Sequence, residues 1–472
     1  MSSLPPPSAF DHCAVQIWSA LEGARSALHR LEMRGQGALA SVFPVSDLAA
    51  ASLGVAGLAI SELVAQCGVA APRVVVDRRL ASLWFGSSLH PLGWEMPALW
   101  DAVAGDYRTA DGWIRLHTNA PHHRAAALAV LDAPVEREAV ATAVRRWTAH
   151  ELESAVVAQG GCAAAMRGLD AWAAHPQGRA VQQEPLLAWQ VHPQPGQPFS
   201  FSAGAWQPSA QRPLQGLRVL DLTRILAGPA ATRWLAGHGA EVLRIDPPGW
   251  EEPGTVPEVT LGKRCARLDL REPKDRAVFE QLLAGADVLV HGYRDGALEG
   301  LGFGAAWRRR LNPSLIDASL NAYGWSGPWQ QRRGFDSLVQ MSAGIADAGM
   351  HRLGRDRPTP LPLQALDHAT GYLMAAAVVM ALVRRMQGQG GSTVRASLAR
   401  TAHLLAGHVV GDPDACPLAP VNEAEDFSAA IEATSWGAAR RLRAPVEVAG
   451  APMHWERAAC ALGTSTAAWR DG

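Results

Sequence analysis

The sequence is short of cysteine and carries almost no net charge. Its 472 residues include six cysteines, and its formal net charge is −1 at pH 7. The cysteines lie far apart and form no Cys-x-x-Cys pair, which argues against a disulfide framework or a zinc site and predicts a reducing cytoplasm. Acidic and basic residues are interspersed, so the charge pattern indicates neither a nucleic-acid nor a membrane partner.

Targeting segments and phosphate-binding motifs are also missing. Residues 1–7 lack the charged and apolar regions of a signal peptide, and the longest apolar run, 373–383, is shorter than a membrane span requires. No P-loop and no Gly-x-Ser-x-Gly turn occurs, and residues 226–229 read Leu-Ala-Gly-Pro where a dinucleotide fold carries Gly-x-Gly-x-x-Gly. We therefore expect a cytoplasmic protein that binds no nicotinamide or flavin dinucleotide.

The second half alternates between strand and helix patterns. β-forming runs at 217–223, 241–246, 266–270 and 287–290 are separated by a glycine-bearing turn, helical patterns or loops. This alternation predicts an α/β fold with a doubly wound parallel sheet, whose ligand site lies at the carboxyl ends of the strands.

Composition divides the rest of the chain. Residues 1–80 are predicted to be a helical leader, 81–189 a small α+β domain, 190–213 a linker rich in Pro, Gly and Ser, 214–411 the large domain, and 412–472 a tail that wraps over the rest. Residues 43–76 and 363–396 share an aspartate, an Ala-rich apolar helix and a strand at a constant offset. A true repeat and chance similarity in an Ala-rich chain are both open.

Asp367 is the main candidate for chemistry. It directly precedes an apolar helix predicted at 368–385, the position of an N-cap, and a proline-stiffened loop brings it to the sheet edge. A helix N-terminus is expected to keep its carboxylate ionised near neutral pH, and a fixed carboxylate can attack an activated acyl group. Both roles are open. The adjacent His122 and His123 are expected to point apart, as isolated polar side chains.

Several short motifs in the second half resemble the class III (family III) CoA-transferases in order and spacing. They are found at 214–223, 227–229, 239–249, 262–270, 286–298, 312–313, 324–328, 334–344, 366–371 and 394–398. The resemblance implies a Rossmann-like large domain and identifies Asp367 with the family's catalytic nucleophile. The motifs at 111–113, 151–153 and 175–178 resemble the family's small domain, which here precedes the large one instead of following it.

The resemblance also implies a coenzyme A site. Positions that pack the nucleotide correspond to Ile225, Ala227, Leu268, Tyr293 and Tyr323, and Arg271 corresponds to a basic position near the phosphates. Arg294, Arg264 and Lys263 are further candidates for the phosphates, or exposed charges with no ligand. The family's assisting glutamine is replaced by Leu226, an arginine by Gly300, and the glycine-rich loop over the nucleophile has no clear counterpart.

These features predict a homodimeric CoA-transferase that moves CoA from an acyl-CoA to a carboxylic acid. Coenzyme A is then a substrate, and no metal or prosthetic group is needed. Two alternatives are open. An α-methylacyl-CoA racemase would need a histidine where this chain has Phe335. A catalytically inactive CoA-binding subunit would fit the lost glutamine and glycine-rich loop.

Overall fold

The central sheet of the computed structural model, which describes residues 8–192, 206–412 and 415–470, has seven strands. Their order is β10-β9-β8-β11-β12-β13-β7. The bounds are β7 (Ala188–His192), β8 (Arg218–Leu222), β9 (Glu241–Asp246), β10 (Lys263–Arg267), β11 (Val288–His291), β12 (Ile316–Asn321) and β13 (Gly391–Ser397). β8 to β13 are parallel and β7 is antiparallel to β13. The predicted parallel α/β sheet is confirmed, and its order reverses between β8 and β11, where a crevice opens.

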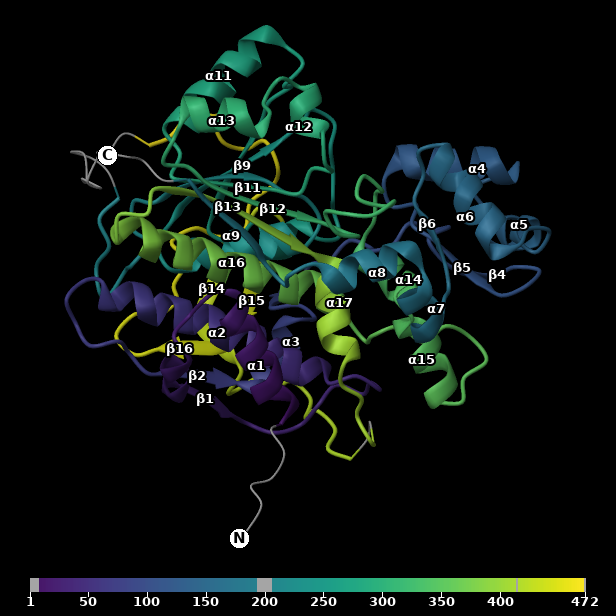
Figure 1. The fold of residues 1–472 in the computed structure, drawn as a ribbon, viewed down its shortest axis with the longest axis horizontal. Coiled ribbons are helices and arrows are strands. Elements are labelled where there is room, and N and C mark those ends of the chain that lie inside the picture. Colours follow the sequence, from purple (N-terminus) through teal and green to yellow (C-terminus); the bar gives the residue numbers. More distant parts are fainter. Residues whose placement is uncertain (1–7, 193–205, 413–414, 471–472) are drawn as a thin grey trace.

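Helices cover both faces of this sheet (Figure 1). One face carries α9 (Ala227–Gly237) and α16 (Ala365–Met386), and the other carries α11 (Pro273–Ala284), α12 (Ala297–Gly300) and α13 (Ala305–Leu311). The strands are apolar on both sides, since Val219 belongs to the first core and the next residue, Leu220, to the second. α16 approaches α9 so closely that a Cβ atom at Gly371 would clash with the carbonyl oxygen of Ala227.

The N-terminal segment forms a layer under α16 (Figure 1). It contains α1 (Ala9–Ala20), a 3-10 helix (Arg25–Arg30), β1 (Leu31–Arg34), α2 (Val45–Ala65), β2 (Val74–Asp77) and α3 (Arg78–Trp84). α2 and α16 are long and apolar enough to cross a membrane by length and composition, although the sequence suggested no such run. Their most apolar windows are 89% and 100% buried inside the protein, as expected for helices that pack on all sides.

Residues 105–165 form a smaller unit beside the main sheet. β4 (Gly105–Arg108), β5 (Trp113–Leu116) and β6 (Ala163–Ala165) pair antiparallel, and α4 (Pro121–Leu131), α5 (Arg137–Val144) and α6 (Ala149–Ala158) share a core with them. α7 (Leu169–Ala174) and α8 (Pro176–Gln183) follow. The chain then enters β7, so the predicted linker 190–213 begins inside a strand; 193–205 lies outside the described residues.

The remaining elements connect distant parts of the chain. α10 (Val256–Val259) and α17 (Leu398–Ala406) belong to the large unit, whereas α14 (Asp336–Ser342) and α15 (Ile345–Arg352) share a core with Cys162 and Ala164 of the smaller unit. The tail forms β14 (Phe427–Thr434), β15 (Gly437–Leu442) and β16 (Val446–Val448). β15 pairs with β3 (Leu89–Pro91) and β16 pairs with β2, so the tail completes sheets that the N-terminal half begins.

The two segments with similar sequences also have matching elements. α2 and α16 begin at residues 45 and 365, β2 and β13 end at 77 and 397, and α3 and α17 begin at 78 and 398, a difference of 320 each time (365 − 45, 397 − 77, 398 − 78). The residues before the two long helices, Pro44 and Gln364, have nearly the same backbone angles (φ −76°, ψ 65° and φ −79°, ψ 61°). This agreement favours a true repeat over chance.

Candidate active site

A cavity of about 400 Å³ lies at the carboxyl ends of the central strands. Its walls come from the loops after β8, β11 and β12, the starts of α16 and α17, and two residues of α4. The lining residues are His122, His123, Leu222, Thr223, Arg224, Ile225, Ala227, Trp250, Gly292, Tyr293, Arg294, Ala297, Leu320, Asn321, Ala322, Arg332, Arg333, Gly334, Phe335, Asp367 and Leu398. This is the position expected for a ligand of a parallel sheet, and the volume suits a small molecule.

Asp367 lines this cavity from the first turn of α16. The expectation that it is the N-cap is wrong, because α16 begins at Ala365 and its N-cap, Gln364, makes no side-chain cap bond. The backbone N–H of Asp367 instead donates to Oδ2 of Asp336, at 2.9 Å, so a carboxylate of α14 acts as the capping acceptor. Within the described ranges, no hydrogen bond to the Asp367 carboxylate occurs, which leaves its oxygens available to a ligand.

The two buried carboxyl groups are electrostatically coupled. Burial and the neighbouring Asp336 raise the pKa of Asp367 well above its usual range. Burial also raises the pKa of Asp336, to about 6, although hydrogen bonds from Gln340 and from the Asp367 backbone favour its ionised form. Asp336 therefore ionises first and Asp367 holds its proton longer. Desolvation and repulsion by Asp336 thus oppose the stabilisation that the helix N-terminus gives to the ionised Asp367 carboxylate.

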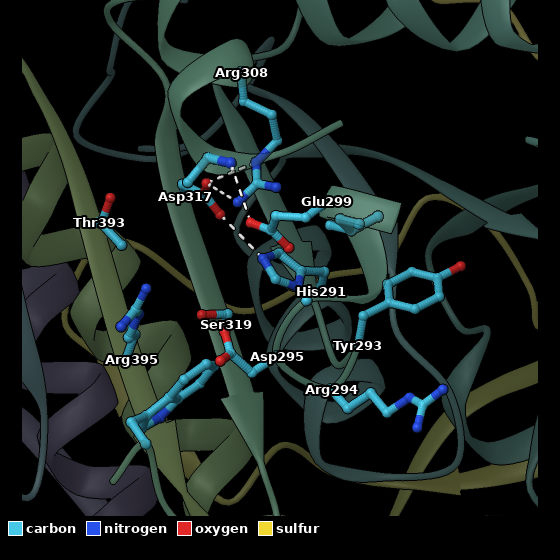
Figure 2. A pocket seen from close by; sticks show the side chains of 14 residues that line it. His291, Tyr293, Arg294, Asp295, Glu299, Arg308, Asp317, Ser319, Thr393 and Arg395 are labelled. Atoms are coloured by element: carbon cyan, nitrogen blue, oxygen red, sulfur yellow. Dashed lines mark hydrogen bonds and ion pairs between the residues drawn. The ribbon is translucent and has the colours of Figure 1, made fainter. Parts of the chain in front are cut away.

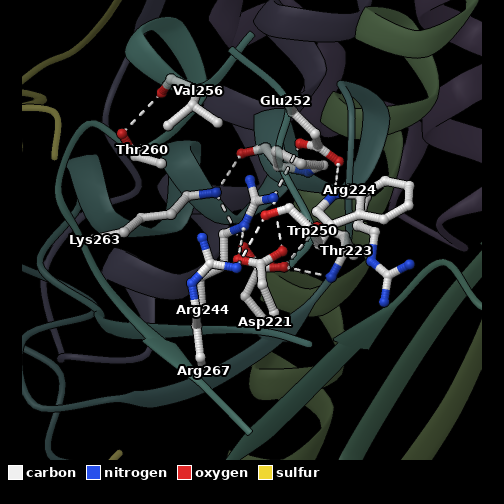
Figure 3. A network of polar contacts seen from close by, with 12 residues as sticks. Asp221, Thr223, Arg224, Arg244, Trp250, Glu252, Val256, Thr260, Lys263 and Arg267 are labelled. Atoms are coloured by element: carbon white, nitrogen blue, oxygen red, sulfur yellow. Dashed lines mark hydrogen bonds and ion pairs between the residues drawn. The ribbon is translucent and has the colours of Figure 1, made fainter. Parts of the chain in front are cut away.

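The loop after β8 forms the wall near Ile225. Ile225 adopts a left-handed conformation (φ 64°), which is rare for a β-branched residue and costs roughly 1–3 kcal/mol. Its N–H donates to Glu252 Oε1 at 3.0 Å, and Glu252 also pairs with Arg244 at 3.0 Å. Arg244 also pairs with Asp246 at 2.8 Å, and Figure 3 shows Arg244 beside Glu252. This buried network fixes the strained turn at the cavity.

Two of the basic residues proposed for phosphate binding are used elsewhere. The Nζ of Lys263 is buried and donates to Asp221 Oδ2 at 3.0 Å and to the Pro229 carbonyl at 2.9 Å (Figure 3). Arg264 pairs with Glu241 and with carbonyl groups of the tail. Neither side chain lines the cavity, because both are committed to internal partners.

Other basic side chains give the cavity a positive wall. Arg224 stacks over Trp250, with 4.3 Å from its Cζ to the ring centroid, and its Nη2 lies 3.4 Å from the Tyr293 hydroxyl. Among the described residues, no carboxylate lies within ion-pair distance of Arg224, Arg294 or Arg333. Arg332, by contrast, pairs with Glu153 at 2.9 Å. Unpaired guanidinium groups favour a ligand with phosphate or carboxylate groups.

Both histidines of the first turn of α4 face this cavity, so the expectation that they point apart is wrong. The His122 and His123 ring centroids are 4.1 Å apart, and His123 lies edge-on to Phe335 at 5.9 Å. Burial, together with His122 and Arg333, lowers the pKa of His123 to about 4. They were predicted to be isolated polar side chains because they stand far from Asp367 in sequence.

The site residues implied by the resemblance divide into two groups. Ile225, Ala227, Tyr293, Arg294 and Asp367 line the cavity together. Leu268 lies in the apolar core beneath α11, and Tyr323 is buried with its hydroxyl 3.2 Å from Ser342. Arg271 is exposed and pairs with Asp269 at 2.7 Å. None of these three reaches the cavity.

A second space adjoins the cavity beside Tyr293 and Arg294. It holds only about 30 Å³ and is lined by His291, Arg308 and Asp317, which are joined by ion pairs of 3.3 Å and 2.6 Å (Figure 2). Tyr293 and Arg294 extend away from these pairs in Figure 2. This space has room for about one water molecule. In the described part of the chain, no group of three or more His, Cys, Asp or Glu residues could hold a metal ion.

Comparison with known proteins identifies the region around the cavity. The family model for "CoA-transferase family III" matches residues 214–415. An acetyl-coenzyme A transferase of Hypoxylon pulicicidum is 35% identical over 213 residues, which are 43% of this chain and 36% of that protein. A probable fatty acyl-CoA transferase of Mycobacterium tuberculosis is 37% identical over 188 residues (37% and 47%). The human succinyl-CoA:glutarate CoA-transferase is 31% identical over 224 residues (43% and 50%).

The chain thus spans half or less of the length of these curated relatives. The matched region contains β8 to β13 and most of the cavity, whereas His122 and His123 precede it. Residues 214–415 of this chain are therefore similar to CoA-transferase family III.

Proposed function

We propose that the protein is a CoA-transferase that moves CoA from an acyl-CoA thioester to a free carboxylic acid. The observation that carries this proposal is Asp367, which lines a cationic cavity and whose carboxyl oxygens accept no hydrogen bond from the residues that the structure describes. The family assignment of residues 214–415 supports the same chemistry.

Asp367 acts as the nucleophile in its ionised form. One carboxylate oxygen attacks the thioester carbonyl, the C–S bond breaks, and a mixed anhydride and CoA thiolate form. The thiolate attacks the Asp367 acyl carbon, releases the donor acid and leaves an aspartyl-CoA thioester. The acceptor carboxylate attacks that thioester, expels the CoA thiolate and forms a mixed anhydride with Asp367. The thiolate then attacks the acceptor's acyl carbon, which gives the new acyl-CoA and releases the Asp367 carboxylate. No net proton is consumed, and two acyl transfers replace one direct exchange.

The cavity residues provide the groups that coenzyme A needs. Arg224 and Arg294 are placed to meet its phosphates, and Ile225, Ala227 and Tyr293 to pack its apolar parts. We also propose that the large domain is Rossmann-like, since its strand order reverses at β8 and β11, and that the small domain precedes it in a rearranged chain. Homodimerisation and a cytoplasmic location stay predictions.

A substrate panel with mass spectrometry tests the activity. The purified chain is incubated with pairs of acyl-CoA donors and carboxylic acids, and hydroxylamine is added during turnover to trap the Asp367 acyl group. We expect turnover, a modified Asp367 peptide, and a loss of roughly three orders of magnitude in Asp367→Asn. An active Asp367→Asn enzyme would refute the mechanism. CoA binding without turnover for any pair would instead support an inactive CoA-binding subunit.

Exchange of an α-proton is the second candidate reaction. It is favoured by the neutral His123 imidazole, which lines the same cavity as Asp367, because such exchange needs both a base and an acid beside the carbon. Phe335, which stands where a racemase histidine is expected, is in contact with His117 (ring centroids 3.8 Å apart) and with His123. Solvent deuterium in a 2-methylacyl-CoA would support this reaction.

A further inference from the structure

His123 is a buried imidazole without an internal partner at the wall of the Asp367 cavity. Only 4% of the residue is exposed, and neither ring nitrogen has a hydrogen-bond partner among the described residues. Leaving a buried polar group unpaired typically costs about 1–3 kcal/mol. An unpaired group that faces a cavity is positioned to bond a ligand, and the same cavity contains the Asp367 carboxylate.

The position of the ring is fixed by the same elements that fix Asp367. α4 begins at Pro121, which sets the first turn and places His123 at its third residue. The ring lies edge-on to Phe335, the N-cap of α14, and Asp336, the next residue, binds the Asp367 backbone. A short chain of contacts therefore sets the two side chains relative to each other.

His123 is uncharged at neutral pH and can still donate one hydrogen bond. Burial, His122 and Arg333 lower its pKa to about 4, so the ring is neutral at neutral pH and has one N–H donor and one acceptor nitrogen. Two of the other basic side chains of the cavity are engaged with protein groups. Arg332 is paired with Glu153, and Arg224 is stacked on Trp250 beside Tyr293.

We propose that His123 is a catalytic residue that donates a ring N–H hydrogen bond to the carbonyl oxygen of the acyl group held at Asp367. This inference rests on the proposed transferase function. As the Asp367 oxygen bonds to the carbonyl carbon, the carbonyl π electrons move to oxygen, and they return when the C–S bond breaks. The His123 proton stays on its nitrogen throughout, so the step needs no proton acceptor. The donor thus comes from outside the region that matches the family.

Two substitutions separate hydrogen bonding from packing. His123→Leu removes the donor and should lower kcat about 10²–10³-fold, the usual effect of losing one oxyanion donor, with KM for acyl-CoA changed less than about threefold. His123→Gln keeps an N–H donor and should retain kcat within about tenfold of the wild type. His238→Leu is the matched control, since His238 is also buried, has no hydrogen-bond partner for its ring among the described residues, and lies outside the cavity. A kcat for His123→Leu within threefold of the wild type would overturn the proposal.

A measurement without turnover separates this inference from the proposed function. Asp367→Asn should hold a ¹³C-carbonyl acyl-CoA unreacted, and its infrared carbonyl stretch should move to higher frequency when His123→Leu is added. An unchanged frequency would overturn the role of His123 even if the enzyme is an active transferase, and a shift would support it even if no substrate pair turns over. If His123→Leu does not fold, His123→Gln and His123→Phe are compared in the same way. Deuterium exchange abolished by His123→Gln would refute the donor role in favour of proton transfer.

Discussion

Asp336→Asn should shift the pH dependence of catalysis to lower pH. In the proposed mechanism Asp367 attacks as a carboxylate, and burial with the adjacent Asp336 raises its pKa. Activity should therefore rise as pH rises through that raised pKa. The substitution removes the neighbouring charge, lowers the pKa of Asp367, and keeps an amide oxygen that can accept its backbone N–H, now 2.9 Å from Asp336.

The size of the shift is set by the repulsion between the two carboxylate charges. Two unit charges roughly 5 Å apart at an effective dielectric constant of ~20 repel by about 3 kcal/mol. That energy corresponds to at most about two pKa units. We therefore expect the rising limb of the pH–activity profile to move to lower pH by about one to two units. The repulsion acts only where Asp336 is ionised, which its pKa of about 6 allows near neutral pH.

The assay is kcat/KM for acyl-CoA measured across the pH range in which both variants stay folded, because this ratio reports the free enzyme. Asp347→Asn is the control, since Asp347 lies outside the cavity and pairs with His351. A limb that stays in place, or moves to higher pH, would refute the electrostatic coupling of Asp336 and Asp367.

Four further outcomes are expected. The pKa of Asp367 is raised in the folded protein, so the stability linked to this group is present at low pH and is lost as pH rises through that pKa. Asp367→Asn should therefore raise the free energy of unfolding more at pH 8 than at pH 5. Denaturant titrations at the two pH values measure this difference. Asp47→Asn should leave kcat nearly unchanged while destabilising the fold by about 1–3 kcal/mol, since it breaks the partly buried ion pair with Arg78. A 2-methylacyl-CoA kept with the wild type in deuterated water should retain its α-proton, and steady deuterium uptake would contradict the transferase assignment. Sedimentation at micromolar concentration should give a dimer, and a monomer would contradict the predicted assembly.

The parts of the fold that follow from local pattern could be predicted from the sequence. Runs such as 217–223 and 287–290 are apolar on both sides because β8 and β11 are covered on both faces, and the parallel sheet follows from them. Asp367 was found because an acid stands beside a long apolar helix. The helix start was misplaced because its cap is Asp336, which no pattern near residue 365 reveals.

The charge and surroundings of the site depend on tertiary contacts. From the sequence alone, the helix dipole is the one visible influence on the pKa of Asp367. In the folded protein, burial and Asp336 raise that pKa. Likewise, adjacent histidines point apart on a strand, but His122 and His123 stand in the first turn of a helix whose end faces the cavity. No periodicity connects that turn with α16, so the place of His122 and His123 in the cavity wall could be found only from the structure.

The two aspartates of the repeat differ in the side chain that the start of the next helix places beside them. Asp47 and Asp367 are both the third residue of a long apolar helix that follows nearly the same backbone angles. At the start of the next helix stand Arg78 in one case and Leu398, 320 residues later, in the other. Arg78 binds both carboxylate oxygens of Asp47, at 3.2 Å and 2.9 Å, whereas Leu398 has no donor and lines the cavity. An arginine at this position keeps the carboxylate in an ion pair, and a leucine leaves it free for a substrate; the same fold element is therefore structural in one copy and open to chemistry in the other.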